Sequence, residues 1–200
     1  MIHVSTGARR GAIVAALALT LTACSSVPAT GPSATGSDDA ASLLAAHGLA
    51  GLDAREVIDT LDATPLDERD AELMASIRPD ELLLTDADGT EVSLPMPDDE
   101  FYVSFAPYAD STHDCYFHSL TTCTGEMHEE PVSITVTDVA TGEVVVERDA
   151  VTHANGFMGL WLPRDGEFDV TMTHEGLTAT ERVTTDDADD ATCVTTMQLA

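Results

Sequence analysis

Residues 156–185 have the sequence GFMGLWLPRDGEFDVTMTHEGLTATERVTT, whose pattern indicates the fold class. Apolar and polar residues alternate along most of it, and Asp165-Gly166 and Glu175-Gly176 interrupt the alternation. A period of two indicates strands with one buried face, and a polar residue followed by glycine is typical of a tight turn. The stretch therefore predicts consecutive short antiparallel strands.

The same pattern extends over residues 81–200. ELLLTD and EVSLPM flank Asp88-Gly89, which predicts a hairpin. Further short segments rich in Val and Thr are FYVSFAPY, PVSITVTDV, EVVVERDAV and CVTTMQL. Turns at this spacing favour an antiparallel β-sandwich or a partly open barrel. The chain has no phosphate-cradling glycine loop and no nucleophile elbow, which argues against nucleotide-binding α/β folds and serine hydrolases.

Residues 38–80 carry helical signals instead. An Ala- and Leu-rich run ends at Gly48, and Asp53 can cap a second segment. Pro65 can begin a third helix, in which Leu66, Leu73, Met74 and Ile77 form an apolar stripe, so two or three short helices are predicted. We therefore expect an α+β protein with a short helical lobe before the β-domain. So small a lobe needs a packing partner, either the β-domain or a second copy in a homodimer.

The N-terminus predicts export and anchoring. Arg9-Arg10 precede the apolar run GAIVAALALTLTAC, which is too short to span a bilayer and is typical of a signal peptide. The segment Leu21-Thr22-Ala23-Cys24 resembles a bacterial lipobox. Residues 1–23 are thus predicted to be removed and Cys24 to be acylated, with residues 24–37 as a flexible tether. The chain is expected to be extracytoplasmic and lipid-anchored to the membrane.

The charge excludes one class of partner. The chain has 36 acidic residues, eight Arg and no Lys, for a net charge of −28. A protein that docks on nucleic acid neutralises phosphate with clustered Lys and Arg. We therefore predict no nucleic-acid binding.

The chemistry is concentrated in residues 109–130, ADSTHDCYFHSLTTCTGEMHEE, which fit neither strand nor helix. Cys115, His118 and Cys123 form a C-x2-H-x4-C motif, and Cys193 opens the last predicted strand. Three thiolates and an imidazole can surround one ion, and such soft ligands suit Cu(I) and also Zn(II). The four residues are the predicted metal ligands.

Simpler interpretations stay open. The three cysteines after Cys24 allow one disulfide in any of three pairings, with the third thiol buried, or a structural zinc site. His113 and His128 are more typical of solvated loop residues, and His47, His153 and His174 have no cysteine or metal-ligand partner nearby in sequence. A structural β-sandwich lipoprotein is therefore the alternative function.

Five blocks carry a family resemblance. They are LMASIRPDEL (73–82), MPDDEFYVSFAPY (96–108), HDCYFHSLTTCTGE (113–126), NGFMGLWLPR (155–164) and TCVTTMQL (192–199). In these blocks the chain resembles the CueP family of extracytoplasmic copper-binding proteins. The resemblance implies copper resistance, copper as the bound ion, and copper ligands at Cys115, His118, Cys123 and Cys193. It also implies a dimerising helical lobe over residues 38–80.

Two functional hypotheses follow. The protein sequesters Cu(I) or hands it to a copper-accepting protein, or it is a thiol-based cupric reductase. In the second hypothesis a thiolate pair becomes a disulfide as two Cu(II) ions are reduced.

Overall fold

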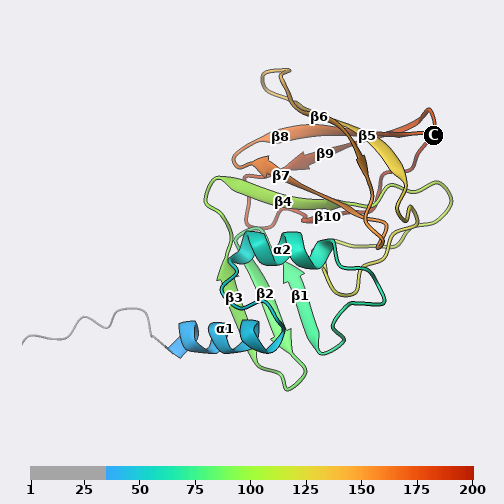
Figure 1. Cartoon of the computed structure of the whole chain (residues 1–200). Coiled ribbons are helices and arrows are strands. Elements are labelled where there is room, and N and C mark those ends of the chain that lie inside the picture. Colours follow the sequence, from blue (N-terminus) through green and yellow to red (C-terminus); the bar gives the residue numbers. More distant parts are fainter. Residues whose placement is uncertain (1–34) are drawn as a thin grey trace, which may run out of the picture. The chain divides into compact units, whose positions relative to one another are not determined.

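The fold is described from a computed structural model, whose described residues are 35–200 (Figure 1). Its elements in chain order are α1 (Thr35–Ala46), α2 (Ala54–Asp62), β1 (Leu73–Ile77), β2 (Glu81–Asp86), β3 (Glu91–Pro95), β4 (Glu100–Phe105), β5 (Pro131–Asp138), β6 (Val144–Val151), β7 (Met158–Pro163), β8 (Glu167–His174), β9 (Leu177–Thr184) and β10 (Cys193–Val194). The predicted signal peptide, Cys24 and most of the tether lie outside these residues. Neither helix in the described part is long and apolar enough to cross a bilayer.

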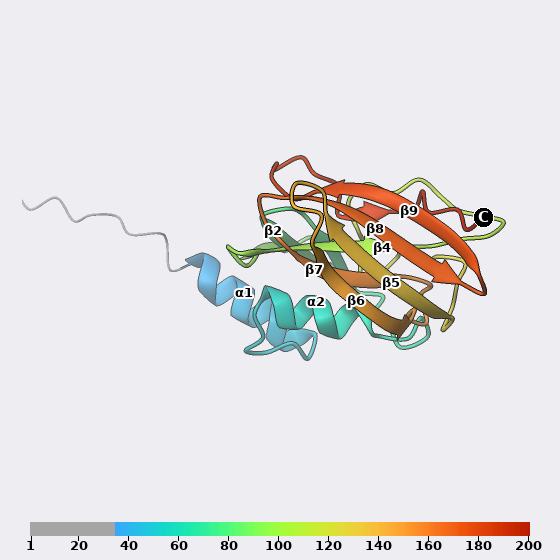
Figure 2. The ribbon, with the colours of Figure 1, turned by 90° about the horizontal axis from the view of Figure 1, so that it is seen from above.

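Three sheets form the β-structure. Their strand orders are β1-β2-β3, β10-β4-β7 and β6-β5-β8-β9. The four-stranded sheet is antiparallel, and its strands follow one another in that order in the view from above (Figure 2). It packs on the β10-β4-β7 sheet as a sandwich, with both helices and β1–β3 on the other side (Figure 1). The predicted α+β class with a β-sandwich is confirmed.

β4 is shared by two hydrophobic cores. Phe101, Val103 and Phe105 point into the sandwich core, whereas Tyr102 points into the core formed with the helices and β1–β3. Successive side chains of a strand face opposite sides of its sheet, so one strand can serve both cores. The apolar packing of β4 thus holds the helices against the sandwich.

Two local expectations differ from the structure. The predicted third helix is wrong, because Leu73–Ile77 form β1, with Leu73, Ala75 and Ile77 buried and Met74 exposed. The predicted last strand is shortened to Cys193–Val194 and runs parallel to β4, so this sheet is mixed. By contrast, the hairpin at Asp88-Gly89 is confirmed as the connection between β2 and β3.

Helix α2 begins as predicted at Asp53. The Asp53 carboxylate accepts a hydrogen bond from Glu56 N, and the Glu56 carboxylate accepts one from Asp53 N, which is a capping box. Val57 and Ile58 on its inner face are fully buried. Asp62 ends the helix on the same face and is also buried.

Candidate metal centre

Residues 109–130, the cysteine loop, contain no helix or strand, as predicted, but the middle of this loop lies along the edge of β1. Ile77 N donates a hydrogen bond to His118 O at 2.8 Å, and Leu120 N donates to Ala75 O at 2.9 Å. These bonds satisfy backbone groups that the edge strand would otherwise leave unpaired. They also fix the position of His118, which is fully buried.

The other side of the loop is bound to the start of β10. Tyr116 O accepts hydrogen bonds from Thr192 N at 3.0 Å and Cys193 N at 3.1 Å. His118 N donates to Thr192 Oγ1 at 3.0 Å. These contacts bring Cys193 beside Cys115, although the two are separated by 78 positions.

All four predicted ligand residues come together. One donor atom from each of Cys115, His118, Cys123 and Cys193 lies within 4.8 Å of the others. Cys115 and Cys193 form a disulfide, and Cys123 is the free thiol among the described residues. The Cys123 and Cys115 sulfurs are 3.6 Å apart, and His118 Nδ1 is 3.6 Å from Cys193 Sγ. Of the three disulfide pairings left open by the sequence, the structure contains Cys115–Cys193.

The free thiol has an activating environment. Burial alone would raise the pKa of Cys123, but the neighbouring His118 imidazole and the backbone N–H of Ser119 outweigh it and lower that pKa. The Arg69 guanidinium adds to this effect, and its Nη1 donates to Cys123 O at 2.9 Å. The lowered pKa favours the thiolate of Cys123, which is the form that binds metals and transfers electrons.

A buried carboxylate lies behind the histidine. Asp62 Oδ1 is 3.3 Å from His118 Nε2. Burial opposes the charged forms of both groups, yet their mutual contact raises the pKa of His118 and lowers the pKa of Asp62. The raised pKa favours the imidazolium form of His118, and in either charge state the contact with Asp62 places a proton on Nε2.

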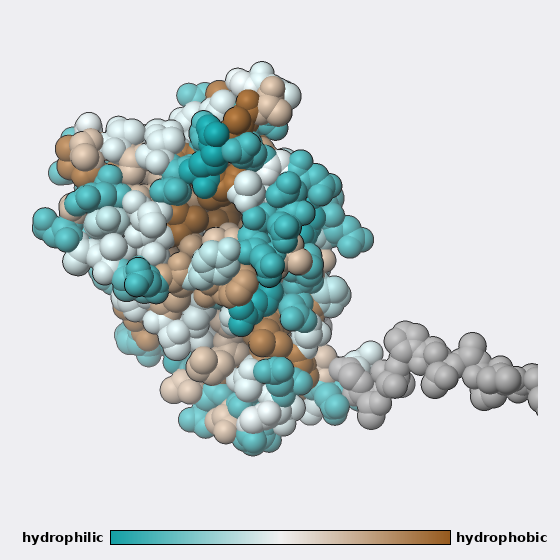
Figure 3. Space-filling view, turned by 180° about the vertical axis from the view of Figure 1, so that it is seen from behind, coloured by the Kyte–Doolittle hydropathy of each residue, from teal (hydrophilic) through white to brown (hydrophobic). Residues whose placement is uncertain are grey.

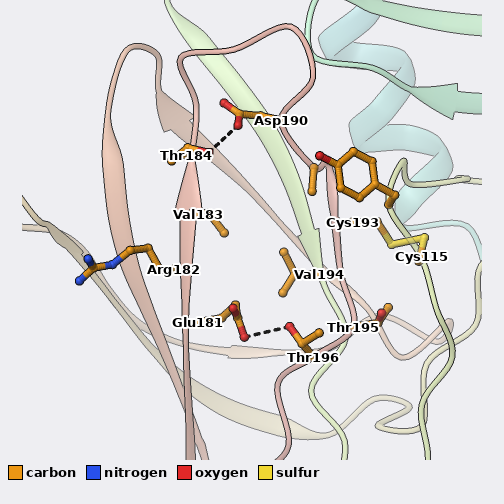
Figure 4. A pocket seen from close by; sticks show the side chains of 12 residues that line it. Cys115, Glu181, Arg182, Val183, Thr184, Asp190, Cys193, Val194, Thr195 and Thr196 are labelled. Atoms are coloured by element: carbon orange, nitrogen blue, oxygen red, sulfur yellow. Dashed lines mark hydrogen bonds between the residues drawn. A yellow bond between two sulfur atoms is a disulfide. The ribbon is translucent and has the colours of Figure 1, made fainter.

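The disulfide is reached from the surface through a groove (Figure 4). The groove has a volume of about 290 Å³, runs between β9 and β10, and has Thr184 and Asp190 on its wall. Cys115 is half-buried, whereas Cys193 is almost fully buried. Cys115 is therefore the more exposed of the two cysteines that line the groove. Seen from behind, much of the protein surface is hydrophilic around a hollow where apolar side chains show (Figure 3).

Comparison with known proteins identifies the family of this chain. The family model described as "Periplasmic copper-binding protein CueP" matches residues 56–198. The chain belongs to the CueP family. A solved structure described as "Crystal Structure of S.CueP" is 40% identical to this CueP-family chain, with a TM-score of 0.75. The match covers 80% of this chain and 97% of the solved one. No curated protein matches the chain.

The remaining histidines of the described CueP-family chain stay outside the cluster. His113 is exposed, His128 Nδ1 bonds to Ala154 O at 2.5 Å, and His174 Nδ1 bonds to Pro131 O at 2.8 Å. His47 pairs with Asp70 at 2.6 Å. His153 approaches the centre indirectly, because its Nε2 is 3.8 Å from the Asp62 carboxylate.

Sequence reasoning missed the residues that support the cluster. Asp62, Arg69 and Thr192 come from α2, the segment after it and the approach to β10. None belongs to a motif that predicts a metal site. A signal did exist for Asp62, since it follows Ile58 by four positions and so lies on the apolar face of a helix.

Proposed function

We propose that this CueP-family protein binds one Cu(I) ion outside the cytoplasm through Cys115, His118, Cys123 and Cys193 once its disulfide is reduced. The observation that carries the proposal is the convergence of three sulfurs and one imidazole nitrogen within 4.8 Å. Thiolates are soft ligands and favour Cu(I), while the imidazole completes a set of four donors. A structural disulfide alone would not require a buried histidine at the same point.

The same cysteines support a redox role. Two thiolates give one electron to each of two Cu(II) ions, which yields one disulfide and two Cu(I) ions. Cys115 and Cys193 are the product pair of this step, because they form the disulfide in the structure. Cys123 and His118 lie next to the new disulfide and are available to hold Cu(I) as it forms. Repeated turnover would use an external thiol reductant.

The predicted lipid anchor would place this chemistry at the membrane. Cys24 and the tether set the reach of the copper centre, and the extracytoplasmic location permits a disulfide. We also propose that the protein forms a homodimer through residues 38–80 and that it transfers Cu(I) to an accepting protein.

The binding role is tested with single variants. Each variant competes for Cu(I) with a chromogenic Cu(I) chelator under reducing, anaerobic conditions. We expect a lower affinity for Cu(I) in each of the four single variants Cys115→Ser, His118→Ala, Cys123→Ser and Cys193→Ser. A triple variant that lacks Cys115, Cys123 and Cys193 measures the background from the acidic surface. Parent-like Cu(I) affinity in all four variants would show that this centre does not exist. Zn(II) titration of the same set separates a copper site from a structural zinc site.

The redox role needs a separate measurement. Fully reduced protein is mixed with Cu(II) without oxygen, and the Cu(I) formed is counted together with the thiols lost. We expect two Cu(I) ions for every two thiols consumed, and the Cys115–Cys193 disulfide in the peptide map. Thiol counts that stay constant as copper binds would leave storage as the function.

A further inference from the structure

Asp62 is the buried charged group that the copper chemistry above does not use. Its side chain is 2% exposed. Asp62 is the last residue of α2 and lies 56 positions before His118 in the sequence. A carboxylate is costly to bury unless charged or hydrogen-bonding groups surround it. The question is therefore which groups compensate it and what they do together.

Three segments supply partners to this carboxylate. Tyr102 Oη in β4 donates a hydrogen bond to Oδ2 at 2.5 Å. Asn155 Nδ2 donates to Oδ1 at 3.3 Å, and His118 Nε2 lies 3.3 Å from the same oxygen. Tyr102 stays a donor, because burial and the nearby Asp62 charge raise its pKa well above the ordinary value. Tyr102 and Asn155 thus hold the carboxylate while it accepts from His118.

The imidazole has two nitrogens on different edges, and Asp62 contacts one of them. A carboxylate only accepts hydrogen bonds, so the proton of this contact resides on Nε2. In the neutral ring Nδ1 then keeps its lone pair, and it faces Cys193 Sγ at 3.6 Å. The ring cannot easily turn over, because it packs on Phe157 with 4.6 Å between the ring centres.

We propose that Asp62 is a positioning residue of the copper centre: it holds the Nε2–H of His118 and thereby makes Nδ1 the metal-binding nitrogen. The inference rests on the proposed function, in which His118 is a ligand. A carboxylate behind a metal-bound histidine fixes its tautomer and makes its free nitrogen a stronger donor. Helix α2 therefore contributes to the centre although it supplies none of the four ligands.

The first test measures the tautomer without copper. Asp62→Asn keeps the side-chain volume but removes the charge, and its NH2 group replaces one of the two oxygens that accept from Tyr102, His118 and Asn155. In the metal-free parent with its disulfide intact, we expect nitrogen NMR of His118 to show the proton on Nε2. In Asp62→Asn we expect a mixture of tautomers. The parent spectrum in the variant would overturn the proposal.

The second test measures Cu(I) affinity in reduced full-length protein. We expect Asp62→Asn to lower the affinity for Cu(I) by about 10–100-fold, because substitutions of residues that hold a metal ligand in place typically have effects of this size. The matched control is Asp59→Asn, which makes the same change on the same helix at an exposed position and should bind like the parent. Far-UV circular dichroism of each variant establishes that it is folded, and Asp62→Glu provides a second carboxylate variant if Asp62→Asn does not fold.

A double variant separates this inference from the proposed function. If Asp62 acts through His118, Asp62→Asn should cause no further loss of Cu(I) affinity in a His118→Ala background. An equal loss in both backgrounds would overturn the positioning role. If His118→Ala itself binds Cu(I) like the parent, the proposed ligand set fails, whereas the tautomer measurement still decides the Asp62–His118 contact.

Discussion

Reduction of the Cys115–Cys193 disulfide should destabilise the metal-free protein by an amount set by the chain between the two cysteines. They are 78 positions apart. In the chain-entropy account, a loop of that length restricts the unfolded chain by about 15 cal/mol/K, or about 4.5 kcal/mol at 25 °C. Measured losses for native disulfides begin at about 2 kcal/mol. At about 2–4 °C per kcal/mol for a protein of this size, the melting temperature should fall by roughly 4–18 °C.

Cu(I) should restore the lost stability. An ion bound by the Cys115 and Cys193 thiolates closes the same loop as the disulfide and adds bonds to His118 and Cys123. Binding to the folded state alone stabilises it by about 4.1 kcal/mol when free Cu(I) exceeds its dissociation constant about 1,000-fold. Disulfide and copper are thus alternative cross-links between the cysteine loop and β10, and they should produce similar melting temperatures.

The assay compares thermal unfolding of three forms by circular dichroism: disulfide, reduced metal-free, and reduced with chelator-buffered Cu(I). Cys123→Ser is the matched control, because it keeps the disulfide pair but lacks one proposed ligand. Its disulfide form should melt like the parent, and its reduced form should gain less from Cu(I). A melting temperature that reduction leaves unchanged would contradict the role of the disulfide. A reduced parent whose melting temperature saturating Cu(I) does not raise would contradict the role of copper as a cross-link.

Three further changes test the loop, the free thiol and the anchor. Gly125→Ala should destabilise the protein by about 1–3 kcal/mol, because an added Cβ would lie 2.6 Å from the backbone oxygen of Gly156; calorimetry that shows no loss contradicts this packing. Alkylation of Cys123, followed by peptide mass spectrometry, should reach half its maximal rate at lower pH in the folded disulfide form than in urea, since its folded pKa is lowered. In the folded His118→Ala variant, the pH of half-maximal alkylation should be higher than in the parent. An unchanged pH would show that His118 does not cause the lowered pKa of Cys123. Replacing Cys24 with Ser should release the protein from membranes into the soluble fraction, and a variant that stays membrane-bound would disprove the lipobox.

The β-sandwich could be predicted because its strands have one buried face, and the alternation is visible residue by residue. β1 could not be predicted in the same way. Leu73 and Ile77 are four positions apart, which places them on one face of either a helix or a strand. Ala75, midway between them, is also buried, as expected for a strand in which every second residue faces the core. Alanine is a strong helix former, however, so its presence does not exclude a helix. Only pairing with β2 and with the cysteine loop resolves the ambiguity.

The four residues that cluster could be singled out from the sequence because cysteine and histidine are rare and reactive. The disulfide pairing of the cysteines could not be predicted from the sequence. Cys115 joins Cys193 because Tyr116 O accepts two backbone hydrogen bonds from Thr192 and Cys193, and local sequence does not encode a contact over that separation. Cys123 is left free by the same contacts, although it lies nearer to Cys115 in the chain.

Asp62 shows how far a pattern can point to function. An acidic residue on the apolar face of α2 contradicts the hydrophobic pattern, and such a conflict is expected mainly at functional or strained positions. The conflict alone identifies no partner, because Tyr102, His118 and Asn155 reach the carboxylate from three distant segments. The predicted boundary at residue 80 even separates Asp62 from all three of them in sequence. The structure places the carboxylate 3.3 Å from His118, so the environment of the candidate metal centre is assembled across that boundary.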